Sequence, residues 1–321
     1  MNELVARSPS MREAVRLAGR VAATDTNVLV TGESGVGKDA LALYLHAESP
    51  RAAGPFVRID CAALPAELLE AELFGYERGA FTGATAAKPG RLEAAHKGTL
   101  VLDEIAHLPR DAQAKLLRVI ERREFERLGG RRTVKVDARL LALTNVDLDD
   151  AVRRRAFRED LFYRLNVVRI HVPPLRERRE DVAPLAEKFL AGYAAKHGRP
   201  ARRFDEGALA ALGLYDFPGN VRELANVIER AVIVSDGREV CAKDLPEAVR
   251  AAATLGARRE RRPTLAELEA EYIREVLAAA RGNKSEAARV LGISRKNLYE
   301  RLARQGSGGA DAGEKPVTDE R

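Results

Sequence analysis

Residues 27–39 read Asn-Val-Leu-Val-Thr-Gly-Glu-Ser-Gly-Val-Gly-Lys-Asp. A short apolar run comes first, a glycine-rich loop follows, and an apolar helix is expected from Ala40 to His46. Glycines let backbone amides turn towards an anion, a helix N-terminus adds partial positive charge, and Lys38 has the reach to bind terminal phosphates. The stretch therefore predicts a phosphate-binding loop in an α/β domain with a parallel sheet. A chance glycine turn is the alternative, but strand and helix flank the loop as phosphate binding requires.

We expect every residue of this loop to contribute to nucleotide binding, namely Gly32, Glu33, Ser34, Gly35, Val36, Gly37, Lys38 and Asp39. Asp39 stands where a Ser or Thr hydroxyl normally holds magnesium, so the metal must be held by other groups. A buried strand at 98–104 ends in two carboxylates. In a nucleotide site Asp103 would organise Mg²⁺ and its waters, while Glu104 would polarise the attacking water. Two acids that only cap the next helix are the alternative. ATP and Mg²⁺ are the expected cofactors.

The remaining patterns in the first half of the chain extend the α/β domain. They predict a helix within residues 1–26, strands at 55–60 and 138–144, helices at 64–74 and 109–122, and a hairpin at 124–137 around two glycines. Asn145 follows a buried strand, at the edge of a parallel sheet where ligands bind, and is a candidate sensor of the terminal phosphate. A loop-starting Asn fits the local pattern equally well.

The hexapeptide Gly79-Ala80-Phe81-Thr82-Gly83-Ala84 has a single aromatic residue, Phe81, with one glycine on each side of it. Taken alone, it is most simply a glycine-rich turn whose Phe81 folds back into the domain. Its position between the phosphate loop and the two carboxylates favours a different interpretation, a contact loop that nucleotide chemistry moves.

Composition shifts divide the 321 residues into parts. The run Val172-Pro173-Pro174-Leu175 breaks the chain, and helical patterns run from 176 to 249. We therefore expect an α/β subdomain at 1–173, an all-helical lid at 174–249, a linker at 250–263, a helix-turn-helix domain at 264–305 and a disordered tail at 306–321.

The helix-turn-helix is expected from residues 285–291, the turn Gly292-Ile293 and a second helix that opens at Ser294, with Ser at both N-caps. Between residues 258 and 305 there are 12 Lys or Arg against 7 Asp or Glu, which gives +5 of the chain's net charge of +6. The second helix would present polar and basic groups to a DNA major groove: Ser294, Arg295, Lys296, Asn297, Tyr299 and Arg301. A charged helical hairpin that docks on the lid is the alternative.

The two cysteines, Cys61 and Cys241, lie far apart and have neither metal-ligand nor redox spacing. The N-terminus carries no apolar signal core, and no apolar run approaches the length of about 18 residues that a membrane helix needs. These features favour a reducing, cytoplasmic location with no membrane partner.

Six motifs together resemble one protein family. They are GESGVGKD at 32–39, ELFGYERGAFTGA at 72–84, GTLVLDEI at 98–105, FREDLFYRLNV at 157–167, VPPLRER at 172–178 and FPGNVREL at 217–224. The chain resembles a sigma-54-dependent transcriptional activator, or bacterial enhancer-binding protein, which is an AAA+ ATPase with a Fis-type DNA-binding domain. The resemblance covers nearly the whole chain, and the intact GAFTGA hexapeptide is nearly private to that family.

The resemblance implies a role for each matching residue. Lys38 would bind the phosphates, Asp103 the magnesium ion, and Glu104 would activate water. Asn145 with Thr144 would form the first sensor and Arg222 the second, while Arg158 and Arg164 match arginine fingers that reach a neighbouring subunit's nucleotide. An acid at Asp39 is usual in this family.

Two residues depart from the family pattern. Asp60 replaces the Asn that commonly restrains the catalytic glutamate, so an anion takes the place of a neutral partner in this switch. Ala6 stands where glycine is usual beside the adenine pocket. No receiver, GAF or other sensory domain precedes residue 1, so we expect either a separate regulatory protein or a fragment or short member of the family.

The resemblance also implies partners. Residues 79–84 would contact sigma-54 and its RNA polymerase, and the terminal domain would bind double-stranded DNA at an upstream enhancer site as a dimer. The ATPase would form a homo-oligomeric ring, with a hexamer expected and a heptamer left open. The expected function is ATP-driven remodelling of the sigma-54 polymerase closed complex to the open complex. One alternative is a regulator or repressor whose ATPase core serves only assembly, and another is an ATPase that remodels some other protein.

Overall fold

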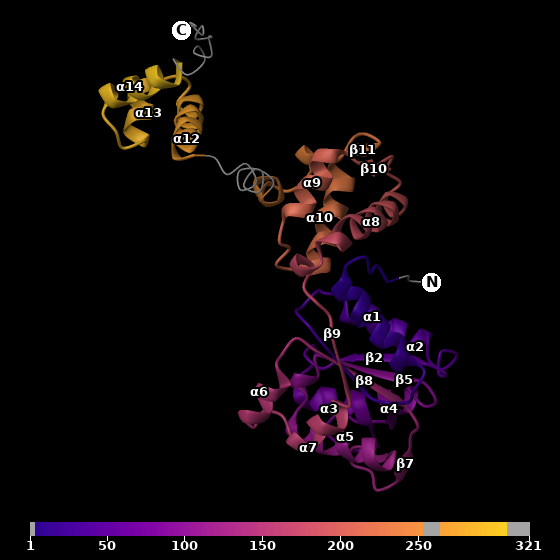
Figure 1. Ribbon diagram of the computed structural model, residues 1–321. Helices are drawn as coiled ribbons and strands as arrows, with labels where there is room; N and C mark the ends of the chain where they lie inside the picture. The colour runs from indigo at the N-terminus through magenta and orange to yellow at the C-terminus, as the bar shows by residue number, and fades with distance from the viewer. Residues whose placement is uncertain (1–3, 253–263, 307–321) are drawn as a thin grey trace, which may run out of the picture. The chain divides into compact units, whose positions relative to one another are not determined.

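The computed structural model divides into two compact units, Met1–Ala253 and Thr254–Arg321, and describes residues 4–252 and 264–306 (Figure 1). Residues 253–263 of the expected linker and 307–321 of the expected tail lie outside the described residues. The linker was expected to begin at residue 250, whereas residues 247–252 are helical.

A five-stranded parallel sheet forms the centre of residues 4–171, in the strand order β2-β5-β8-β1-β9. Its strands are β1 (Val28–Thr31), β2 (Phe56–Asp60), β5 (Thr99–Asp103), β8 (Arg139–Thr144) and β9 (Val168–His171). Because the strands are parallel, their carboxyl ends meet at one edge, where a ligand of an open α/β sheet binds. The fold confirms the expected α/β class.

Alternate residues of the central strands face two different cores. On β1, Leu29 packs in one core and Val28 and Val30 in the other, and β5 divides in the same way between Leu102 and Val101. Strands buried on both faces carry continuous apolar sequence, which explains why 28–30 and 100–102 contain no polar residue.

Helices cover both faces of the sheet (Figure 1). One core contains residues of α1 (Pro9–Ala22) and α2 (Lys38–Ala47), and the other contains residues of α3 (Ala66–Phe74), α4 (Arg91–Ala94), α5 (Arg110–Arg122), α6 (Leu148–Arg153) and α7 (Glu159–Leu165). Two hairpins extend from this body: β3 (Gly75–Tyr76) with β4 (Lys88–Pro89), and β6 (Glu124–Glu126) with β7 (Thr133–Lys135).

The lid packs α8 (Val182–His197), α9 (Glu206–Leu214) and α10 (Asn220–Val234) around their own apolar core. It is helical except for a short parallel pair, β10 (Arg203–Phe204) with β11 (Glu239–Val240), so the expectation of helix throughout 176–249 was wrong at those two places. Two-residue strands carry too little pattern to be recognised from sequence.

The terminal unit consists of α12 (Leu265–Ala279), α13 (Lys284–Val290) and α14 (Arg295–Gly306) around a small core that contains Ile273, Val276 and Leu298. Ser294 caps α14, because its Oγ accepts a hydrogen bond from the Asn297 N–H at 3.2 Å. The cap of α13 is Asn283, whose Oδ1 accepts from the N–H groups of Ser285 and Glu286. The expectation of Ser285 as that cap was wrong, because an Asn two residues earlier competes for the same amides.

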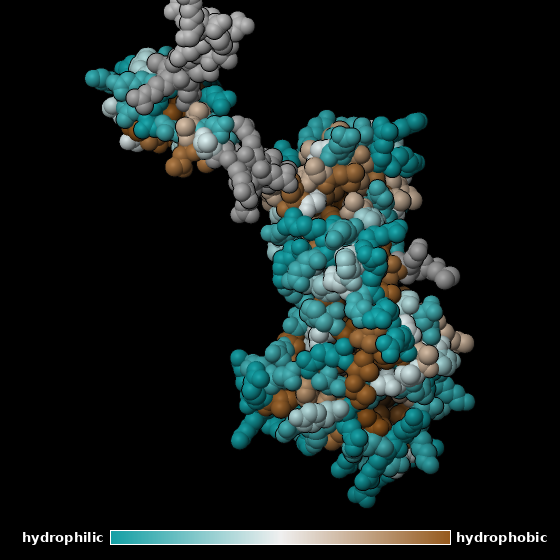
Figure 2. Space-filling model, in the orientation of Figure 1, coloured by the Kyte–Doolittle hydropathy of each residue, from teal (hydrophilic) through white to brown (hydrophobic). Residues whose placement is uncertain are grey.

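None of the helices within 4–252 and 264–306 combines the length and apolarity that spanning a bilayer demands. On the face shown in Figure 2, hydrophilic side chains dominate the surface.

Candidate functional site

The phosphate loop lies between β1 and α2, as expected. Gly35 (φ 76°) and Gly37 (φ 99°) adopt left-handed backbone conformations that favour glycine. Gly35 also packs tightly, because a Cβ atom there would lie 2.5 Å from the Gly219 carbonyl oxygen of the lid. The loop therefore delivers Lys38 to the first turn of α2, where unpaired N–H groups point towards an anion.

Lys38 is buried, with 6% of its surface exposed. Its ammonium group donates to the carbonyl oxygens of Gly32 at 2.9 Å and Glu33 at 3.1 Å, and it lies 3.8 Å from a carboxylate oxygen of Glu104. Burial lowers the pKa of Lys38, and the charges of Glu104 and Asp103 partly oppose that shift. Lys38 thus supplies a partly desolvated cation at the loop, which suits the binding of a polyphosphate.

The two carboxylates at the end of β5 point in different directions. Asp103 is mostly buried and accepts the N–H of Glu104 at 3.1 Å. Glu104 has φ 50° and ψ 50°, a left-handed conformation that is uncommon for a residue with a side chain. Its Oε2 accepts the backbone N–H of Asn145 at 3.1 Å. The turn therefore holds Glu104 next to Lys38 and the end of β8.

Asn145 and Thr144 end β8 beside the phosphate loop, and with Gly32 and Glu33 they line a cavity of about 380 Å³. The Asp60 carboxylate accepts the Ala62 N–H at 2.9 Å, so it closes its own turn. The contacts of Glu104 lead to Asn145 and Lys38 instead of Asp60. The structure thus brings Asn145 to Glu104 and leaves Asp60 on the neighbouring strand.

The lid contacts the phosphate loop through several side chains. Arg222 donates to Ser34 Oγ at 2.9 Å, as a lid sensor requires. Asn220 is fully buried and donates to Glu33 Oε2 at 3.0 Å and to the Ser34 carbonyl at 3.1 Å. Arg176 binds both oxygens of Glu33, at 2.6 and 2.9 Å. The hydrogen bonds from Arg176 and then Asn220 lower the pKa of Glu33 to about 2.

Asp39 and Asp103 both bind one guanidinium group. Arg58 of β2 donates through Nη2 to Asp103, and its Nη1 lies 3.5 Å from Asp39 Oδ2. One guanidinium group therefore contacts both carboxylates. In the described residues no group of three or more His, Cys, Asp or Glu side chains gathers to form a metal site by itself. Mg²⁺ binds through one or two carboxylates plus substrate phosphates, so Asp103 suits such an ion as expected. Asp39, which was not expected to be a ligand, offers a second carboxylate on the same guanidinium group.

The hexapeptide forms the tip of the β3–β4 hairpin. Gly79 (φ 84°) and Gly83 (φ 103°) provide its left-handed positions, and the Gly79 N–H donates to the Ala84 carbonyl at 2.9 Å. Phe81 is 42% exposed, and its ring lies edge-on to that of Tyr76 with the centroids 5.0 Å apart. Phe81 therefore neither folds back into the domain nor stands free at the tip of a contact loop, because it is exposed and yet packs against the Tyr76 ring.

The base of the hexapeptide loop contacts the β6–β7 hairpin. Arg127 of that hairpin pairs with Glu77 at 3.1 Å and with Glu93 at 2.7 Å. A Cβ atom on Gly129 would lie 2.8 Å from Ala80, so the two hairpins touch closely. The loop is therefore attached to the segment that leads through α4 into β5, whose end carries the two carboxylates.

Arg158 and Arg164 flank α7 on the surface. Arg158 pairs with Asp160 at 2.7 Å, and Arg164 with Glu121 at 3.2 Å. Arg158 also lines an open cavity of about 660 Å³ together with Arg110, Arg153 and Arg155. The side chains of both arginines are partly exposed, and their ion-pair partners, Asp160 and Glu121, lie outside the phosphate loop.

The second helix of the helix-turn-helix, α14, together with its cap Ser294, exposes most of the residues expected to meet DNA. Ser294, Arg295, Lys296 and Tyr299 are exposed, and Lys284 lies over the Tyr299 ring at 4.7 Å. Arg301 is half-buried because it donates to Asn297 Oδ1 at 2.7 Å and pairs with Glu269 of α12. Arg301 thus also holds α14 against α12.

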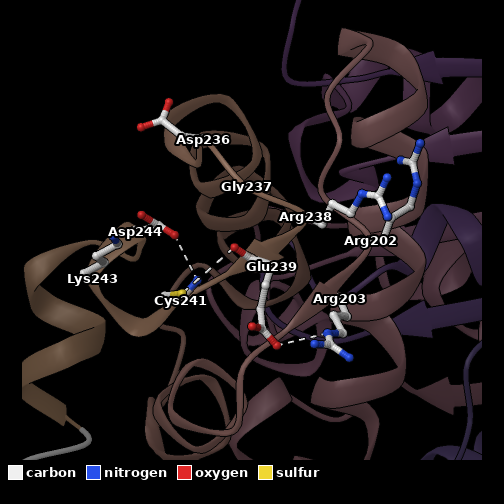
Figure 3. Close-up of a pocket in the computed structure, with 9 residues that line it drawn as sticks. All are labelled: Arg202, Arg203, Asp236, Gly237, Arg238, Glu239, Cys241, Lys243 and Asp244. Carbon is white, nitrogen blue, oxygen red and sulfur yellow. Dashed lines mark hydrogen bonds and ion pairs between the residues drawn. The ribbon is translucent and has the colours of Figure 1, made fainter.

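A cavity of about 750 Å³ lies in the lid, away from these residues (Figure 3). It contains acids and bases together, and Arg203 pairs with Glu239 at 3.0 Å. Figure 3 shows Asp236, Lys243 and Arg202 pointing in different directions, so no set of groups converges on a ligand. We therefore place the candidate site at the phosphate loop.

The parallel sheet, the phosphate loop and the helical lid define an AAA+ P-loop ATPase. The family of the sigma-54 interaction domain matches residues 4–171, the AAA+ ATPase lid domain matches 176–262, and the bacterial regulatory protein Fis family matches 264–304. The chain belongs to the sigma-54-dependent transcriptional activators that combine an AAA+ ATPase with a Fis-type helix-turn-helix.

Curated relatives and solved structures agree with this family. The regulatory protein AtoC of Escherichia coli K12 is 44% identical over 317 residues, which cover 96% of this chain and 68% of that protein. The transcriptional regulatory protein FlbD of Caulobacter vibrioides is 45% identical, over 93% of this chain and 69% of its own. The crystal structure of NtrX from Brucella abortus in complex with ATP is 39% identical, with a TM-score of 0.70, over 95% of this chain and 70% of that one.

Three residues that contact the site were not expected from the sequence: Arg58, Arg176 and Asn220. Arg58 had one available signal, because it lies two residues before Asp60 and so on the same face of β2. Asn220 had a different signal. It stands in a predicted turn, where Asn tolerates a left-handed backbone, and its φ of 55° is of that kind. Arg176 had none, since its partner Glu33 lies 143 residues away.

Proposed function

We propose that this chain forms an ATP-hydrolysing ring that binds upstream DNA and remodels the sigma-54 polymerase closed complex into the open complex. The observation that carries the proposal is the hexapeptide at 79–84. It is intact and largely exposed, and its base is joined by ion pairs to the hairpin beside it.

Each residue at the phosphate loop has a proposed task. Lys38 exchanges its bonds to the loop carbonyls for bonds to the ATP phosphates, which offer stronger charge-assisted acceptors. Glu104 accepts a proton from the attacking water, and the Asn145 N–H orients its carboxylate. Mg²⁺, held by Asp103 with Asp39, would neutralise charge on the phosphates. Arg222 joins the lid to the same nucleotide through the loop at Ser34.

A second subunit completes the proposed site. Arg158 and Arg164 lie on an exposed basic surface, where they meet the nucleotide of a neighbouring copy in a ring, expected to be a hexamer. Ion pairs to Asp160 and Glu121 hold both guanidinium groups on that surface. Such an arginine supplied in trans contributes about a thousandfold or more to hydrolysis.

The terminal unit supports DNA binding as a dimer. Its α14 exposes Arg295, Lys296 and Tyr299 for a major groove. On α12, Leu265 (85% exposed), Leu268 (38%) and Tyr272 (56%) recur at helical spacing on a face that the small core leaves uncovered, and Figure 2 shows hydrophobic atoms at the surface of this helix. A second copy of the same unit would cover this apolar face, and the resulting dimer would bind the two half-sites of a DNA sequence.

The proposal is tested by ATP-dependent promoter opening with sigma-54 polymerase in vitro, detected by permanganate reactivity of the melted strand. We expect the wild-type chain to open the promoter and Thr82→Ala to hydrolyse ATP at the wild-type rate without opening it. Thr85→Ala is the matched control, because this exposed threonine lies just outside the hexapeptide. Normal opening by Thr82→Ala would contradict the role of the loop, and wild-type hydrolysis without opening would favour a regulator whose ATPase serves only assembly.

A further inference from the structure

A single arginine occupies the position expected for the metal. The side chain of Arg58 is 45% exposed, yet its Nη2 donates to the Asp103 carboxylate, which is only 12% exposed. Its Nη1 lies 3.5 Å from Asp39 on the first turn of α2. These are the two carboxylates that fit a magnesium ion, so the guanidinium group and the ion compete for the same oxygens.

The strand register places a third carboxylate close to the same guanidinium. Arg58 and Asp60 share one face of β2 because side chains alternate along a strand, and Asp60 lies opposite Asp103 on β5. Burial lowers the pKa of Arg58, but the hydrogen bond to Asp103 and the charges of Asp103, Asp39 and Asp60 outweigh it, so the pKa is raised. Asp60 therefore already attracts Arg58.

An incidental surface ion pair is the simpler explanation, and such pairs contribute little. The position of Asp103 argues against it. A nearly buried carboxylate without a counter-ion is costly, and Asp39 and Asp103 would repel each other without a cation between them. Arg58 removes that cost, and a second cation that binds the same oxygens would meet the repulsion of the guanidinium group.

We propose that Arg58 is a resident counter-ion of the metal site, which moves from Asp39 and Asp103 to Asp60 when nucleotide and Mg²⁺ bind. This inference rests on the proposed function, because it concerns the same nucleotide site. The Ala62 N–H binds one oxygen of Asp60, and a carboxylate accepts several hydrogen bonds, so Asp60 has capacity for the guanidinium. A carboxylate at residue 60 can pair with the guanidinium group as an ion, which a neutral Asn could not do.

The test measures binding and needs no turnover. The dissociation constant of the full chain for N-methylanthraniloyl-ADP is measured by fluorescence anisotropy with Mg²⁺ and with EDTA, and the ratio of the EDTA value to the Mg²⁺ value reports the coupling to metal. Arg58→Gln removes the competing cation and leaves the two carboxylates with Lys38 as the remaining nearby cation, so we expect this ratio to rise about tenfold, as the loss of one charge-assisted hydrogen bond predicts. Arg58→Lys keeps the cation and should stay within about threefold of the wild type.

Two further variants test the second position of Arg58. Asp60→Asn removes the carboxylate that receives the guanidinium, so the ratio should fall below the wild-type value. In the Arg58→Gln background the same Asp60→Asn change should have no effect. Arg58→Met is a second neutral variant should Arg58→Gln fail to fold.

Each outcome points to one conclusion. An unchanged or lower ratio in folded Arg58→Gln or Arg58→Met overturns the counter-ion role. An equal effect of Asp60→Asn in both backgrounds overturns the movement to Asp60. If the wild-type chain does not bind the nucleotide, or binds it equally with and without Mg²⁺, the proposed nucleotide site itself fails.

Discussion

The backbone conformation of Glu104 suits its proposed role as a general base. Its left-handed conformation costs free energy that an ordinary turn would avoid, and such strain persists only where the surroundings impose it. The Asn145 N–H and the Lys38 ammonium hold the carboxylate in place. The side chain is thus oriented before substrate arrives, which is what a general base requires.

At this scale we predict that Glu104→Gln binds ATP with an affinity within about threefold of the wild type but hydrolyses it about a thousandfold more slowly. The amide keeps the size and one acceptor of the carboxylate while it loses the basic oxygen. Anisotropy of a labelled nucleotide and release of phosphate measure the two quantities. Glu48→Gln, an exposed change at the end of α2, should alter neither, and hydrolysis within tenfold of the wild type by Glu104→Gln would rule out its role as base.

At the scale of whole elements, the lid is joined to the phosphate loop by side chains that both carry. Arg176 and Asn220 belong to lid segments, yet both bind Glu33. The pKa of Glu33 is lowered to about 2 from an ordinary value of 4.5 because its charged form is the bound form. Its contribution to stability is therefore fully present above pH 4.5 and is lost as the pH falls towards 2.

We predict that Glu33→Gln destabilises the chain by about 1 kcal/mol at pH 7, a value discounted for the exposure of both partners. The difference in melting temperature between the wild type and this variant should shrink progressively below pH 4.5. Thermal unfolding at several pH values from 7 to 3 measures it. Arg176→Gln should produce a similar loss, and the double variant should lose no more than either single one. A difference that stays constant down to pH 3 would refute the assigned ion pair.

The role proposed for Arg158, the N-cap residue of α7, and for Arg164, in its last turn, requires an assembly of several chains. Within one subunit Arg158 and Arg164 pair with Asp160 and Glu121 on the surface, and exposed pairs of this kind add little stability. A neighbouring copy in a ring would supply the nucleotide that they are proposed to reach. Hydrolysis would then depend on protein concentration, since each complete site needs two chains.

We predict that Arg158→Ala and Glu104→Gln are each nearly inactive alone but recover activity when mixed. A site that takes Glu104 from one chain and Arg158 from the other is complete, and random mixing of equal amounts yields up to about a quarter of such sites. ATPase assays of the mixtures measure the recovery. Arg158→Ala mixed with Arg164→Ala is the matched control, because no single chain there carries both arginines to a neighbouring site. Lack of recovery in the first mixture, or recovery in the second, would argue against action in trans.

The sequence by itself determined the local features of this protein. The phosphate loop, the hexapeptide and the helix-turn-helix all depend on short-range rules: glycines at positive φ, apolar periods of two or 3.6 residues, and capping side chains. These rules predicted four of the five strands of the sheet, β1, β2, β5 and β8, to within one residue at each end, but they missed the edge strand β9. They were less informative for the cap of α13, where Asn283 and Ser285 both had suitable side chains.

Only the tertiary structure decided which distant residues meet. The order β2-β5-β8-β1-β9 places β2 beside β5, so Arg58 reaches Asp103 across 45 residues of sequence. The lid folds back on the loop, so Asn220 binds Glu33 across 187 residues. No local period encodes such pairs, because they depend on how complete elements pack. The sequence therefore determined which chemical groups the site contains, and the packing of strands and lid decided which of them act on one another.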